Sequence, residues 1–162
     1  MAIRNILKDG DPTLLKSSRE VVSFNRRLHL LLDDMVETME EAEGAGLAAP
    51  QVGVLRRVAV VATPDGIVEL VNPEIVQTDG EQEGAEGCLS FPGLYGLVKR
   101  AEKATVRAKD RHGKEFTIEG EGIVARAFCH EIDHLDGIVF TERAERILTP
   151  EELQEILTEN EE

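Results

Sequence analysis

The segment from His130 to His134, with the sequence H-E-I-D-H, constrains the fold more than any other part of the chain. Residues four apart share one face of an α-helix, so two histidines at this spacing can bind one metal ion. A helix is predicted from about Gly122 to Leu135, because apolar residues recur at helical spacing and an Asp-Gly pair follows. Glu131 lies beside the histidine face, within reach of a metal-bound water. The alternative is a pair of exposed or hydrogen-bonded histidines without a metal.

The composition fits a single domain. With 162 residues, of which 41% are hydrophobic and 31% charged, the chain is long enough to bury a core. No apolar run approaches the ~20 residues that span a bilayer, and no signal-peptide core follows Met1. We therefore expect one domain over residues 1–162, a cytoplasmic location and no membrane partner.

The charge is strongly negative, with 18 basic and 32 acidic side chains and a net charge of −14. This argues against binding to nucleic acid, and no specific DNA binding is expected. Seven basic side chains lie between Leu97 and Lys114, whereas eight acidic ones lie between Thr141 and Glu162. One interpretation is that the basic segment is a solvated hairpin and the acidic segment a solvated tail. The alternative is that the basic segment is a docking face.

Local patterns predict the remaining elements. Asn25–Ala42 is the clearest helix, with one apolar face and an asparagine at its start. A third, acidic helix over residues 149–162 begins with a capping box. Four segments are predicted to be extended, the last two as a hairpin: Arg57–Thr63, Ile67–Thr78, Lys103–Lys109 and Lys114–Glu119. A helix, then several strands, then helices indicates the α+β class.

Two histidines do not complete a catalytic metal site, which usually has three protein ligands and one open position. The third histidine of a metzincin would fall at Phe140, which cannot bind a metal. Glu155 is one candidate, although it sits in an acidic helix and can equally be a surface charge. Cys88, in the small-residue turn Glu86–Ser90, would give a Cys/His/His set. Spacing alone also allows Cys88 to be a small buried hydrophobe.

A third segment, Gly44–Gln51, has the sequence G-A-G-L-A-A-P-Q and almost no side-chain bulk. Its glycines allow the backbone of a ligand to approach closely, and Gln51 carries an amide that can donate into a site. The alternative is a tight connection packed beneath a sheet.

Together, the three segments resemble the peptide deformylase family, which is marked by G-x-G-L-A-A-x-Q, E-G-C-L-S and H-E-x-D-H-L-x-G in this order. They stand here at Gly44–Gln51, Glu86–Ser90 and His130–Gly137, and the similarity extends roughly from Ile3 to Phe140. The resemblance implies an α+β fold of mainly antiparallel sheets packed around the central H-E-x-x-H helix. It also implies hydrolysis of the formyl group from the N-terminal formylmethionine of new proteins, with release of formate.

The resemblance also implies the site. Cys88, His130 and His134 would hold one divalent ion, Fe²⁺ by analogy, although spacing does not choose among Fe²⁺, Zn²⁺, Ni²⁺ and Co²⁺. Glu131 would be the catalytic carboxylate, and Gln51 and the Leu89 backbone N–H would receive the developing oxyanion. The substrate would be an extended nascent peptide held by the backbone at Gly46 and Gly87. Its methionine pocket is assigned to three small or apolar residues, Ala45, Ile123 and Ala127.

Two features depart from the family pattern. Cys129 stands before the first histidine, where glutamine is common, and is expected to be a core residue. Glu151–Glu162 is acidic, whereas some relatives have a basic C-terminal extension that docks on the ribosome; a transient ribosome contact would then use the basic stretch Leu97–Lys114. Two other functions stay open: a zinc peptidase with Glu155 as third ligand, and a catalytically silent binding protein of the same fold.

Overall fold

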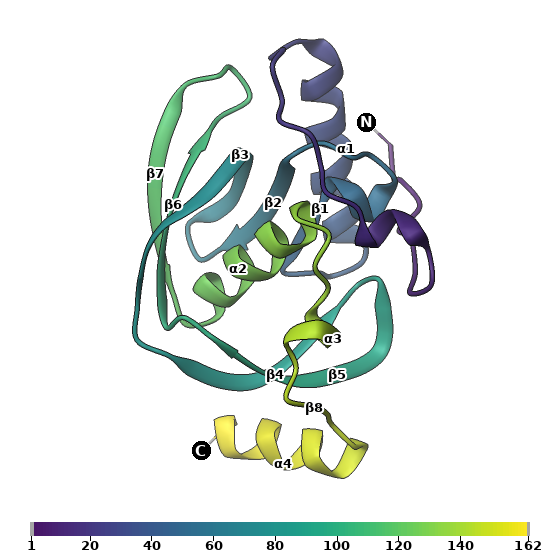
Figure 1. The fold of residues 1–162 in the computed structure, drawn as a ribbon, viewed down its shortest axis with the longest axis vertical. Helices are drawn as coiled ribbons and strands as arrows, with labels where there is room; N and C mark the ends of the chain where they lie inside the picture. The colour runs from purple at the N-terminus through teal and green to yellow at the C-terminus, as the bar shows by residue number, and fades with distance from the viewer. Residues whose placement is uncertain (1, 162) are drawn as a thin grey trace.

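The structure is a computed structural model that describes residues 2–161 (Figure 1). Its helices are α1 (Arg26–Glu41), α2 (Ile123–Leu135), α3 (Phe140–Arg143) and α4 (Pro150–Glu161), with 3-10 turns η1 (Pro12–Leu15) and η2 (Ala49–Val52). Its strands are β1 (Gly46–Ala48), β2 (Val58–Thr63), β3 (Gly66–Asp79), β4 (Gln82–Cys88), β5 (Phe91–Arg100), β6 (Lys103–Lys109), β7 (Glu115–Glu121) and β8 (Arg146–Ile147).

The described strands form two antiparallel sheets, one of five strands in the order β1-β2-β3-β6-β7 and one of three strands in the order β4-β5-β8. In the larger sheet, the pairing of β3 with β6 shifts between Val71 and Glu74. Pro73 lies within this irregularity, as expected of a residue that cannot donate to a strand ladder. Strands β1 and β4 end their respective sheets, so each leaves one backbone edge unpaired by another strand.

Helix α2 lies between the two sheets, and the larger sheet curves around it (Figure 1). It packs Ala127, Phe128 and Ile132 against buried residues of the larger sheet, such as Val61 and Val106. The other face of that sheet packs against α1. The predicted arrangement, mainly antiparallel sheets around the central H-E-x-x-H helix, is therefore confirmed.

The predicted helix boundaries agree closely with the structure. The Asn25 side chain caps α1 by accepting a hydrogen bond from the Leu28 backbone N–H at 3.3 Å. The capping box of α4 is formed, because Thr149 Oγ1 accepts from the Glu152 N–H and Glu152 accepts from the Thr149 N–H. Helix α4 packs beside β4, on the side of the small sheet away from α2 (Figure 1). Within the described residues, none of the helices is both long and apolar enough to cross a membrane.

Candidate metal centre

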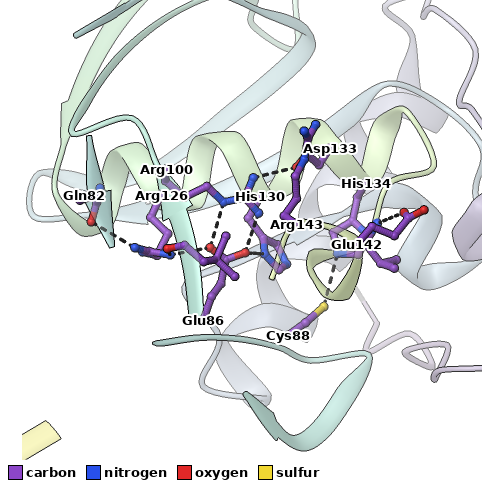
Figure 2. A network of polar contacts seen from close by, with 12 residues as sticks. Gln82, Glu86, Cys88, Arg100, Arg126, His130, Asp133, His134, Glu142 and Arg143 are labelled. Carbon is purple, nitrogen blue, oxygen red and sulfur yellow. Dashed lines mark hydrogen bonds and ion pairs between the residues drawn. The ribbon is translucent and has the colours of Figure 1, made fainter. Parts of the chain in front are cut away.

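Cys88, His130 and His134 converge between α2 and the end of β4. One ligand atom from each lies within 4.8 Å of the others. The two histidines are one helical turn apart on α2, with ring centroids 4.9 Å apart, and both are buried. Cys88 Sγ lies 3.3 Å from His134 Nε2 (Figure 2). Of the two roles that the sequence left open for Cys88, the structure supports the ligand position.

The donor set fits a divalent transition metal. A thiolate and two imidazoles suit zinc or iron, whereas magnesium and calcium prefer oxygen ligands. His130 Nδ1–H donates to Glu86 Oε2 at 2.6 Å, which leaves Nε2 free for a metal. His134 presents Nε2 to Cys88 Sγ, whereas its Nδ1 is buried without a hydrogen-bond partner among the described residues.

A buried ionic network surrounds Glu86 and holds His130 in place (Figure 2). Arg100 makes a bidentate pair with Glu86, at 2.6 and 3.0 Å, and also binds Asp133 at 2.7 Å. Arg126 donates to Glu86 Oε1 at 2.9 Å, the oxygen that also accepts from Arg100 Nε. Although burial raises the pKa of Glu86, hydrogen bonds from His130 and Arg100 bring it well below its ordinary value. Glu86 is therefore an anion that orients the His130 ring.

The sequence interpretation missed this network. One signal was available, because Glu86 precedes Cys88 by two residues and alternate residues of a strand share one face. The partners were not visible, since Arg100 and Arg126 come from other elements and meet Glu86 only in the folded chain.

Glu131 lies in the same space as the three candidate ligands. It is buried, and its Oε1 has no hydrogen-bond partner among the described residues. Burial raises the pKa of this carboxyl to about 7. Gly46 on β1 makes room for it, because a Cβ at position 46 would lie 2.5 Å from Glu131 Oε2. The glycine thus allows the edge of β1 to approach the carboxylate.

Gln51 comes from η2 and is fully buried beside Cys88. Its Oε1 accepts a hydrogen bond from the Ala48 N–H at 3.0 Å, which fixes the amide orientation. Its Nε2 then donates to Ser90 Oγ at 3.1 Å and lies 3.5 Å from Cys88 Sγ. The sequence predicted Gln51 at the site but missed Ser90, which is buried and anchors the amide.

These residues open into a cavity of about 470 Å³ that lies between β1, the β4–β5 hairpin and α2. All of the predicted site residues except His134 line it; they are Ala45, Gly46, Gln51, Gly87, Cys88, Leu89, Ile123, Ala127, His130 and Glu131. His134 lies behind this lining, as part of the ligand group. Ala127 is buried in the wall, whereas Ile123 is 76% exposed and stands at the mouth. The Tyr95 ring covers Gly87 so closely that a Cβ there would lie 2.7 Å from it.

Three interpretations need correction. Cys129 is half-buried beside the ionic network rather than in the core, and burial raises the pKa of its thiol. Glu155 is exposed on α4 and is not part of the ligand group that the described residues form. Arg100, counted in the basic stretch, has a side chain only 5% exposed because it pairs with Glu86 and Asp133. It therefore presents no charge to a partner.

Comparisons with known proteins agree with this geometry. The model of the polypeptide deformylase family matches residues 3–149. A peptide deformylase of Acetivibrio thermocellus is 53% identical over 95% of this chain and 91% of its own length. One of Caldicellulosiruptor bescii is 52% identical over 96% of this chain and 93% of its own.

Solved structures show the same fold. The crystal structure of peptide deformylase from Thermotoga maritima has a TM-score of 0.85 and 38% identity, covering 88% of this chain and 97% of that one. One from Legionella pneumophila has a TM-score of 0.84 and 44% identity, covering 98% and 95%. Because the family model spans nearly the whole chain and these relatives align along most of their length, the chain belongs to the peptide deformylase family, metal-dependent enzymes that remove the N-terminal formyl group from nascent polypeptides.

Proposed function

We propose that Cys88, His130 and His134 hold the ion on which this deformylation depends, and that it is Fe²⁺ in the cell. The donor set and the anionic Glu86 behind His130 support the ligand assignment. Zn²⁺, Ni²⁺ and Co²⁺ suit the same donors, and the preference for Fe²⁺ rests on the family resemblance. When bound, such an ion supplies a Lewis acid for the formyl carbonyl and lowers the pKa of a water.

Glu131 is proposed to transfer a proton from the attacking water to the leaving amine. A general base must lie near the attacking water and must release its proton again at the pH of the reaction. Glu131 is buried beside the ligand group, and its pKa of about 7 suits both transfers. It takes a proton from the water and later delivers it to the leaving amine.

Gln51 and the Leu89 backbone N–H are proposed to stabilise the oxyanion that develops on the formyl oxygen. Two observations support Gln51: its amide is held by Ala48 and Ser90, and its Nε2 faces Cys88. Leu89 directly follows Cys88 and lines the cavity. Losing one donor of this type costs about 10²–10³ in rate.

The nascent peptide is proposed to lie extended between two strand edges. Gly46 on β1 and Gly87 on β4 line opposite walls of the cavity, and neither strand has a neighbour on that side. A peptide can add to such edges by backbone hydrogen bonds. The formylmethionine side chain then enters between Ala45, Ile123 and Ala127, with Ile123 at the mouth.

One observation carries this proposal. Within the described residues, Glu131 lines the same cavity as Cys88 and His130, His134 completes their ligand group behind the lining, and both free strand edges border that cavity. The direct experiment measures formate released from formyl-Met-Ala-Ser by the Fe²⁺-loaded protein. The acetylated peptide serves as control, because acetyl adds one methyl group at the reacting carbon. Formate release without acetate release is expected. Equal cleavage of both, or cleavage of neither by metal-loaded protein, would contradict the proposal.

We further propose that residues 1–162 act as a single domain in the cytoplasm. Any transient ribosome contact is proposed to use the basic side chains of Leu97–Lys114 other than the buried Arg100. Lys99 and Lys103 are half-exposed, and their ion pairs with Glu145 and Glu121 lie at the surface, where such pairs exchange readily. Ribosome pelleting of a Lys99→Glu/Lys103→Glu variant tests this, with Lys16→Glu as an exposed control. Unchanged pelleting would contradict it.

A further inference from the structure

A second pair of histidines lies outside the deformylase site, where α1 meets the β6–β7 turn. His29 on α1 and His112 in the turn have ring centroids 5.2 Å apart, with their planes at 79°. The pair in the buried centre, His130 and His134, has centroids 4.9 Å apart and planes at 72°. These four are all the histidines of the chain, and the two pairs are similar in centroid separation and in the angle between ring planes.

One hydrogen bond sets the tautomer of His29. Its Nε2 lies 2.8 Å from the Arg111 carbonyl oxygen. A carbonyl only accepts, so Nε2 carries the proton and Nδ1 of the neutral ring keeps its lone pair. Metal-binding histidines typically donate their second N–H to a carbonyl or carboxylate in this way. His130 does the same when it donates to Glu86.

The turn that carries His112 is held firmly against α1. Asp110 Oδ1 accepts hydrogen bonds from the backbone N–H groups of His112 and Lys114, at 2.9 and 3.0 Å. Arg111 then binds Asp33 of α1 at 2.8 Å and Glu69 of β3 at 2.6 Å. The backbone beneath both rings is thus fixed, while the His112 side chain is exposed to solvent.

We propose that His29 and His112 form a second metal site, which binds a divalent transition ion such as Ni²⁺ or Zn²⁺ between helix α1 and the β6–β7 turn. Imidazole ligands suit these ions and not Mg²⁺ or Ca²⁺. Within the described residues, no histidine, cysteine or carboxylate joins His29 and His112 to form a three-ligand group like that of Cys88, His130 and His134. Water therefore fills the remaining positions, and the site is weaker and more exchangeable than the buried centre. The ion links two elements that are distant in sequence.

Ni²⁺ titration of the Ni²⁺-loaded enzyme tests the proposal by calorimetry. One additional ion per chain is expected, with weaker affinity than the first. His112→Ala should weaken this second step at least about tenfold, because losing a ligand costs no less than losing the outer partner that orients one. That variant keeps its fold, because the side chain is exposed and Asp110 binds only the backbone of residue 112.

Two further variants separate ligation from local structure. His29→Gln can still donate to the Arg111 carbonyl but lacks the imidazole, so it should also lose the second ion. Lys114→Ala changes an exposed side chain of the same turn and should bind Ni²⁺ as the unmodified enzyme does. Paramagnetic broadening by the second ion should reach amides of both α1 and the turn. Absence of a second ion, or its retention by both histidine variants, would overturn the proposal.

Discussion

Cys88 and Cys129 are the two cysteines of the chain, and they occupy different surroundings. Cys88 faces His134 and Gln51, whereas Cys129 is not among the residues that line the cavity and lies near the charged side chains of the Glu86 network. Cys88→Ser should bind metal at least about tenfold more weakly, since an alcohol is a poorer ligand than a thiolate at neutral pH. Metal analysis after gel filtration measures this, and Cys129→Ser is the matched control that keeps the ion. Normal metal content in Cys88→Ser would refute the ligand assignment.

The ionisation of Glu131 predicts the acid side of the pH profile. Its carboxylate form is the base, so kcat/KM should fall as the pH drops through its pKa. Burial raises that pKa to about 7, and a cation beside it lowers it. The acid limb measured with formyl-Met-Ala-Ser should therefore lie at or below about pH 7, with a tenfold loss per pH unit. A profile that stays flat down to about pH 4 would contradict the role of Glu131.

Glu86 is predicted to matter for stability as well as for the metal. Glu86→Gln would leave Arg100 and Arg126 without their buried anion, which typically costs about 3–5 kcal/mol in the free energy of unfolding. Since hydrogen bonds hold the pKa of Glu86 below its ordinary value, its stabilisation is present at neutral pH and lost as the pH falls through the folded-state pKa.

Urea denaturation measures this loss. The matched control is Glu145→Gln, which removes the surface ion pair with Lys99 and should cost about 1 kcal/mol or less. Equal midpoints and slopes for the two variants would show that the buried network adds no stability.

At the scale of elements, helix α4 is predicted to be dispensable for the chemistry. It packs beside β4 on the side away from α2, and none of its residues lines the cavity among those described. Removal of Leu153–Glu162 leaves β8, whose neighbour Leu148 donates a hydrogen bond to the Tyr95 carbonyl. Turnover of formyl-Met-Ala-Ser should stay within about twofold. A large fall in kcat with an unchanged melting temperature would show that α4 helps to form the site.

Local patterns predicted the elements that local interactions determine. The starts of α1 and α4 follow from capping side chains, and the β6–β7 hairpin follows from its turn. Strands β4 and β5 went unpredicted, because their glycine-rich and mixed sequences show no clear alternation. The pairing of β4 with β5 is determined by the register between the two strands and not by the β-propensity of their residues. The burial of Arg100 could not be predicted from local patterns either, because its partners Glu86 and Asp133 lie on other elements.

At the scale of the whole molecule, the site exists only where three distant segments meet. The segment Gly44–Gln51 forms β1 and η2 at one wall, Glu86–Ser90 ends β4 at the other, and His130–Gly137 lies on and after α2. The sequence motifs predicted which side chains lie together there. The structure adds how they are held, through Ser90 behind Gln51 and Glu86 behind His130.

The central claim is that Glu131 transfers protons beside an ion that Cys88, His130 and His134 hold. The most direct test measures metal content, melting temperature and formate release together in Glu131→Ala, with the exposed Glu40→Ala as control. We predict that Glu131→Ala keeps the buried ion and the fold but loses at least about 10²-fold in kcat, the usual scale of general acid–base catalysis. Near-normal formate release by Glu131→Ala, at unchanged metal content, would contradict the account.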